Sequence, residues 1–254
     1  MTTEQELDLH WVPYGKGSGW VHWGTIPGAS LCAANQSRWA KAVRVACAGE
    51  GGFVDMAQCY DAGVLSGGPL GANLASRTLD RLLGECLLAD PEAFASHMHP
   101  AFGKDLGIVH LYGVPRLQVY ADQWEEPTSL SRLVFGDTPK EHSRPWVECL
   151  ARLLQDPTFE DAIMVACIDT LARIGVYGLG RVPLEPTREE AALLSFAVNN
   201  PAAAEVLWAA HGATRSPVLE LAATGKFGPK DAKGARLWPS RVSRTETALE
   251  AEFP

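Results

Sequence analysis

Apolar residues recur with the period of an α-helix in two stretches of the first half of the chain and through most of its second half. Over positions 38–50 they follow one helical face, with Ser37 before them as an N-cap and Gly51 after them to end the helix. Further faces of this kind follow capping residues or Asx-Pro pairs and cover 79–87, 146–154, 159–174, 191–198 and 204–211. The pattern predicts a mainly α-helical fold.

Three regions depart from this helical pattern. Residues 1–36 hold tryptophans among glycines, which predicts an N-terminal arm that packs over the domain or forms a wall of a sugar cleft. Residues 105–140 hold β-branched and aromatic residues around a Gly and a Pro, which predicts a β insertion. The last residues, 226–254, are basic and contain prolines, which predicts a C-terminal tail. The helical domain is therefore expected to span 37–225.

Composition and charge limit the classes of function. The 254 residues are 46% apolar and 20% charged, which suits a globular protein with a sizeable core. No apolar run has the length of a membrane span, so we expect no membrane insertion. A net charge of −8 argues against nonspecific nucleic-acid binding, which needs a basic face. The first residues are polar and acidic, unlike a secretion signal, so we expect a cytoplasmic protein until something releases it.

The cysteines and glycines give no sign of a cofactor. Six cysteines stand at positions 32, 47, 59, 86, 149 and 167, and none forms the Cys-x-x-Cys pair that is typical of structural zinc sites. We expect them to be buried thiols in a reducing compartment. The glycine-rich run from Gly67 to Gly71 lacks the lysine of a phosphate-binding loop. The sequence therefore predicts neither a metal nor a nucleotide.

The residues best suited to catalysis follow directly after the first helix. Glu50 ends the apolar stripe of that helix, where partial desolvation favours the protonated form of a carboxylic acid. Asp61 follows Tyr60 in a short extended segment, and a small glycine-rich stretch comes next, Ser66-Gly67-Gly68. Hydrolysis of a glycosidic bond commonly uses two carboxyl groups beside the bond, one protonated and one ionised. This stretch therefore predicts a glycan-cleaving site.

From Val45 to Ser76 the chain resembles the lysozyme-like superfamily, at its chitosanase-like end and in phage-type endolysins. In those proteins a helix ends in the acid glutamate, and a small β-element carries a Tyr-Asp pair with a Ser or Thr just beyond. The resemblance implies a lysozyme-like helical domain with that β-element beside the active cleft. It also implies that Glu50 is the general acid, that Asp61 is the general base or an electrostatic stabiliser, and that Ser66 helps to hold the attacking water.

Substrate contacts are expected from residues around these carboxylates, namely Tyr60, Gly67, Gly68 and Asp55. Asp55 is also an alternative to Asp61 as the second carboxylate, because it lies five residues after Glu50 and the backbone can turn it into the same cleft. Many relatives carry a Gln or an aromatic residue at the position of Gly71. That departure leaves open how a sugar is held.

The hypothesis from the sequence is a glycoside hydrolase that cleaves peptidoglycan, an endolysin-type muramidase of a phage that degrades the bacterial cell wall. An inverting mechanism would need the two carboxyl groups roughly 6.5–9.5 Å apart. A chitosanase, a lytic transglycosylase and a noncatalytic glycan-binding protein on the same fold are the alternatives. The expected partner is a polysaccharide, either peptidoglycan or chitosan.

Overall fold

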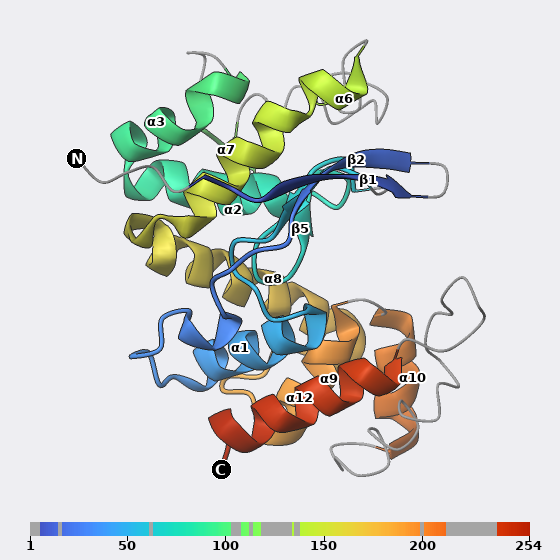
Figure 1. Ribbon diagram of the computed structural model, residues 1–254. Coiled ribbons are helices and arrows are strands. Elements are labelled where there is room, and N and C mark those ends of the chain that lie inside the picture. Colours follow the sequence, from blue (N-terminus) through green and yellow to red (C-terminus); the bar gives the residue numbers. More distant parts are fainter. Residues whose placement is uncertain are drawn as a thin grey trace. The chain divides into compact units, whose positions relative to one another are not determined.

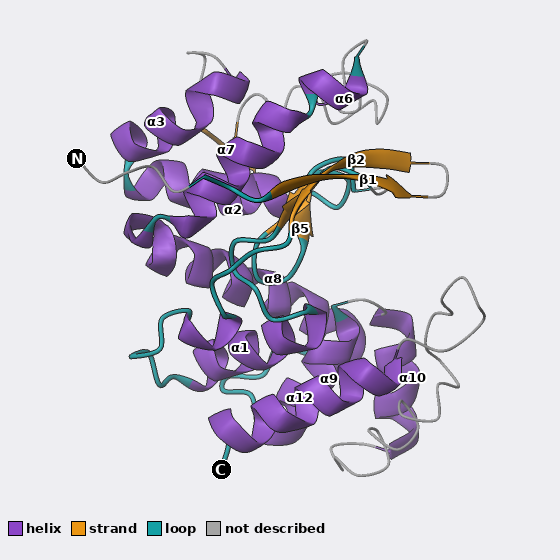
Figure 2. Cartoon of the chain, viewed as in Figure 1, coloured by secondary structure: helices purple, strands orange, loops and turns teal. Residues whose placement is uncertain are grey.

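The computed structural model describes residues 6–14, 17–60, 63–102, 108–111, 114–117, 134, 138–198, 201–211 and 238–254. Helices dominate and a small antiparallel sheet accompanies them (Figure 2), which confirms a mainly α fold with a β-element. The chain forms two compact units. Unit 1 comprises Met1–Ile26 and Phe53–Ala166, and unit 2 comprises Pro27–Gly52 and Cys167–Pro254. None of the described helices is both long and apolar enough to cross a bilayer.

Unit 1 contains a five-stranded antiparallel sheet whose strand order follows the chain. β1 (Leu9–Tyr14) and β2 (Gly17–His22) lie side by side as antiparallel strands (Figure 1). In their register Trp11 is opposite Trp20. Pro13 lies in β1, the edge strand, which is where a sheet tolerates proline. The sheet continues through three two-residue strands, β3 (Ala57–Gln58), β4 (Ser66–Gly67) and β5 (Ala72–Asn73). The aromatic N-terminal region thus supplies two strands of this sheet.

The helices of unit 1 pack around this sheet and against each other. They are α2 (Thr78–Ala89), α3 (Pro91–Phe102), α6 (Pro139–His142) and α7 (Arg144–Gln155), followed by η2 (Pro157–Phe159). α7 contacts α3 as well as β2 and β3. Its apolar face is buried, as the sequence pattern predicted, through Trp146, Val147, Leu150, Leu153 and Leu154.

A second, two-stranded sheet lies within the predicted β insertion. β6 (Ile108–Leu111) and β7 (Val114–Leu117) pair antiparallel, with His110 opposite Pro115. Most of the remaining positions of the 105–140 range lie outside the described residues. The two paired strands, 108–111 and 114–117, agree with the β character that the sequence predicted there, and α2 packs against β7.

Unit 2 is built from helices. η1 (Gly28–Ser30) precedes α1 (Arg38–Glu50), and the later elements are α9 (Arg188–Ala197), α10 (Pro201–His211) and α12 (Trp238–Glu252). α8 (Glu160–Leu179) begins in unit 1 and ends in unit 2. The predicted caps are present, because Ser37 accepts a hydrogen bond from the Ala40 amide and Thr187 forms a capping box with Glu190. α1 packs against both α9 and α12.

The C-terminal residues 238–252 form a helix rather than the expected tail. α12 contacts α1 and α9, and Arg241, Val242, Thr245 and Leu249 on one of its faces are buried. Only two of these four side chains are apolar, so the apolar pattern along the sequence is too weak to predict this helix. The two polar side chains, Arg241 and Thr245, bind to residues of α1 and α9. Tertiary contacts therefore stabilise a helix that the local sequence does not predict.

Candidate functional site

Glu50 closes α1 in unit 2, where the sequence pattern placed it. Its side chain is 18% exposed, and one carboxylate oxygen lies 2.5 Å from a guanidinium nitrogen of Arg241 on α12. Arg241 is itself buried, and it donates a second hydrogen bond to the carbonyl oxygen of Ser195 on α9. Two neighbouring helices therefore hold the Glu50 carboxyl group in place.

A second arginine of α12 caps the same helix end. Arg244 donates through Nε to the Ala48 carbonyl at 3.1 Å and through Nη2 to the Gly49 carbonyl at 2.8 Å. The last carbonyls of a helix lack intrahelical partners and carry partial negative charge, so a guanidinium there is favourable. Gly49 also permits the close approach of α9 to α1, because a Cβ at this position would lie 2.5 Å from Ser195 Oγ.

The other predicted site residues that the structure describes belong to unit 1, not to the unit of Glu50. Asp61 lies outside the described residues, so its pairing with Glu50 stays a prediction. Tyr60 is half-buried in unit 1, and its ring lies 6.4 Å from that of Trp23, which is 50% exposed. Ser66 is buried in β4 opposite Gln58 and Asn73. The structure thus places Tyr60 and Ser66 in unit 1 and Glu50 in unit 2.

The glycines that were expected to bind substrate are in contact with the core of unit 1. Gly67 is buried in β4, and a Cβ there would lie 2.7 Å from Leu150 Cδ2 and 2.8 Å from the Met56 carbonyl oxygen. A Cβ on Gly68 would meet Leu82 Cδ1 at 3.1 Å. Close packing against α7 and α2 accounts for both residues without a substrate.

Replacing Gly67 with alanine is therefore expected to destabilise the protein. We expect Gly67→Ala to lower the free energy of unfolding by about 1–3 kcal/mol, because the backbone carbonyl of Met56 cannot move aside easily. Gly175→Ala on α8 is the matched control, since its Cβ would have ordinary contacts at 3.4 Å and alanine favours a helix. Urea unfolding followed by circular dichroism measures both. An unchanged midpoint for Gly67→Ala would contradict the packing role.

Asp55 lies at the centre of a buried hydrogen-bond network in unit 1. Its Oδ1 accepts the backbone amides of Thr25 and Ile26, each at 2.8 Å, and its Oδ2 accepts the Thr25 hydroxyl at 3.2 Å. The imidazole Nε2 of His22 is 3.1 Å from Oδ2, and the amide nitrogen of Gln155 donates to the same oxygen at 2.9 Å. Asp55 is fully buried, so these contacts describe a structural carboxylate that joins β2, the following loop and α7.

The network changes the protonation of both of its charged members. Hydrogen bonding to Asp55 raises the pKa of His22, and this outweighs the opposing effect of burial. Burial acts to raise the pKa of Asp55, but the hydrogen bonds from His22, Gln155, Ile26 and Thr25 together hold that pKa well below its usual range. Both shifts favour the ion pair in the folded state.

The ion pair predicts how stability varies with pH. The raised His22 pKa gives stability that is complete below about pH 6.5 and is lost as the pH rises through the folded-state value. The lowered Asp55 pKa gives stability that is complete above about pH 3.9 and is lost as the pH falls. The contribution of the pair is therefore expected to be greatest between these limits.

Urea unfolding at a series of pH values measures this contribution. His22→Gln should flatten the loss of stability on the alkaline side. His10→Gln should leave the profile as in the wild type, because the His10–Asp8 pair is exposed. Parallel profiles for wild type and His22→Gln would contradict the assignment.

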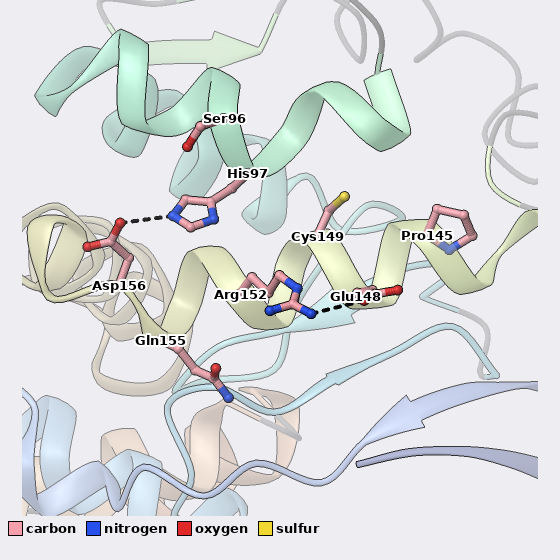
Figure 3. A pocket seen from close by; sticks show the side chains of 8 residues that line it. All are labelled: Ser96, His97, Pro145, Glu148, Cys149, Arg152, Gln155 and Asp156. Atoms are coloured by element: carbon pink, nitrogen blue, oxygen red, sulfur yellow. Dashed lines mark hydrogen bonds and ion pairs between the residues drawn. The ribbon is translucent and has the colours of Figure 1, made fainter. Parts of the chain in front are cut away.

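A pocket of about 670 Å³ opens between α3 and α7 in unit 1 (Figure 3). Two lining residues come from α3. The others come from one face of α7 and from Asp156, the residue that follows α7. The lining comprises Ser96, His97, Pro145, Glu148, Cys149, Arg152, Gln155 and Asp156. Its volume lies within the range of small-molecule sites, and most of the residues that line it have polar or charged side chains.

Two ion pairs line this pocket. His97 Nε2 lies 2.9 Å from Asp156 Oδ2, and Arg152 Nη2 lies 3.2 Å from Glu148 Oε1 (Figure 3). Asp156 also caps η2 by accepting the Thr158 amide at 2.9 Å. Burial acts to raise the pKa of Asp156, but the hydrogen bonds from His97 and Thr158 outweigh it and lower that pKa. Asp156 is therefore charged near neutral pH.

The pocket and the Asp55 network did not follow from the sequence reasoning. His22, Asp55 and Gln155 stand far apart in the chain, so no local spacing links them. A signal for the pocket was present in α7, where Glu148 and Arg152 have the spacing of an ion pair on one helix face.

The described part of the chain offers no cluster of three or more His, Cys, Asp or Glu side chains that could hold a metal ion. All six cysteines are buried thiols. Burial raises the pKa of the Cys47 thiol to about 12, and the charge of Glu50 adds to this effect. Comparisons of the chain with protein-family models, curated proteins and solved structures found no match.

Proposed function

We propose that the protein is a glycoside hydrolase that cleaves the glycan strands of peptidoglycan, as an endolysin-type muramidase does. The observation that carries the proposal is the position of Glu50 at the end of a capped helix, with its side chain mostly buried. A short antiparallel element, β3 to β5, follows in the chain. This order, a helix ending in glutamate and then a small sheet, is the one that the sequence resemblance implies.

In the proposed mechanism Glu50 protonates the leaving oxygen of the glycosidic bond. Asp61 acts as the base and positions a water molecule on the opposite face of the sugar, which is the inverting arrangement. Ser66, which lies buried in β4, is proposed to help hold that water. The acid role requires a protonated Glu50, whereas Arg241 is a partner for the ionised form. The proposal therefore requires this contact to open when substrate binds.

Aromatic residues near the proposed catalytic segment offer a surface for sugar rings. Trp23 is half exposed and its ring contacts that of Tyr60, the residue that precedes Asp61. Phe53 is 40% exposed and lies close to Gly24, the residue after Trp23. A Cβ added to Gly24 would be 2.8 Å from the Cβ of Phe53. Clustered exposed aromatic side chains are unusual on a surface that binds nothing, so they support a ligand with apolar faces.

Digestion of purified peptidoglycan, followed by mass spectrometry of the products, tests the proposal. New reducing ends are expected from a muramidase. Anhydro ends would assign a lytic transglycosylase instead. If peptidoglycan stays intact, chitosan is the next substrate, and cleavage there would assign a chitosanase. Binding to either polysaccharide without any cleavage would overturn the proposal of a hydrolase.

A further inference from the structure

We infer that the pocket between α3 and α7 binds a small zwitterion, a ligand of amino-acid or dipeptide size that carries one ammonium and one carboxylate group. The pocket shares no residue with the proposed glycan site, and this inference does not rest on the glycan-cleaving function. It rests on the order of charges along α7, on how the lining groups are held and on the volume of the pocket.

The charges along the pocket face of α7 alternate in sign. Glu148 and Arg152 stand four residues apart on α7, about 6 Å along its axis, and Asp156 follows after another four positions as the residue that ends the helix. Arg152 is thus flanked by a carboxylate on each side. A simple anion would be attracted by Arg152 and repelled by both neighbours, and a simple cation would be repelled by Arg152. A zwitterion satisfies both signs at once.

The lining groups are already held in position. Glu148 and Arg152 are paired at 3.2 Å, and Asp156 is fixed by both His97 and the Thr158 amide. Gln155 donates its amide nitrogen to the buried Asp55, which leaves its carbonyl oxygen as the group it offers to the pocket. Groups held in this way lose little conformational entropy when a ligand binds.

The guanidinium of Arg152 is suited to the carboxylate of the ligand. It uses one nitrogen for Glu148 in the described contacts, and its planar fork matches a carboxylate in a two-bond arrangement. The ligand's ammonium group then meets Asp156 or Glu148, which accept hydrogen bonds. A volume of about 670 Å³ accommodates such a ligand together with water.

Calorimetric titration with four probes tests the inference on the wild-type protein. The probes are alanyl-alanine, its N-acetyl form, its C-terminal amide and chitobiose. Alanyl-alanine is expected to bind at least about tenfold more tightly than either blocked peptide, since each blocked form loses one charge-assisted interaction. Equal binding of the three peptides, a preference for chitobiose, or no binding of any probe at millimolar concentration would overturn the inference.

Substitutions then locate the site. Arg152→Met is expected to weaken alanyl-alanine binding about tenfold or more, and Arg152→Lys less, because lysine keeps the charge without the fork. Arg173→Met is the matched control, as Arg173 forms the same type of four-residue ion pair with Asp169 on α8. Circular dichroism checks the fold of each variant. Unchanged binding in Arg152→Met would place the ligand elsewhere and overturn the assignment.

Discussion

Glu50→Gln is expected to lower the rate of peptidoglycan cleavage at least about a hundredfold. Glutamine has nearly the same shape but cannot transfer a proton to the leaving oxygen. The fold should persist, because the amide still accepts a hydrogen bond from Arg241, although some stability is lost with the ion pair. Product release from labelled peptidoglycan measures the rate, and circular dichroism measures the fold.

Glu252→Gln is the control for this variant. Glu252 lies near the end of α12 and forms an ion pair with a buried arginine of α1, with Arg44 Nη2 and Glu252 Oε2 separated by 2.7 Å. The chemical change and the type of pair therefore match those of Glu50→Gln in the same unit. We expect a comparable loss of stability and no loss of activity. Equal activity in the two variants would remove Glu50 from the mechanism.

Asp55→Ala is expected to lower the free energy of unfolding by about 3–5 kcal/mol. The change leaves His22 buried beside no carboxylate and removes the acceptor of the Thr25 and Ile26 amides. An unpaired buried charge and unsatisfied backbone donors each oppose folding. Unfolding in urea, monitored by tryptophan fluorescence, gives the free energy directly.

Asp169→Ala serves as the control, since its pair with Arg173 lies on one helix and both side chains are partly exposed to water. A change of no more than about 0.5 kcal/mol is expected there. A similarly small effect of Asp55→Ala would show that the network contributes little. If Asp55→Ala lost catalysis while its stability stayed at the wild-type level, the alternative of Asp55 as the second carboxylate would be favoured over Asp61.

Local patterns predicted the helices well because their determinants lie within a few residues of each other. The 38–50 helix with its Ser37 cap and its end at Glu50, and the capping box at Thr187, were both predicted from neighbouring residues. The β character of 108–111 and 114–117 followed from their composition in the same way. The contact between Glu50 and Arg241 did not follow, since it depends on a neighbour that another helix supplies.

The sequence by itself determined the mainly helical class, the bounds of α1 and the position of Glu50 at its end. Only the tertiary structure decided that 238–252 forms a helix, because Arg241 and Thr245 gain partners on α1 and α9. It also decided that Asp55 is a buried structural carboxylate, joined to Gln155 across 100 residues of chain. The physical reason is the same in both cases. The free energy of a buried polar group depends on partners that folding brings together from distant positions. The periodicity of apolar residues along the chain does not indicate which residues those partners are.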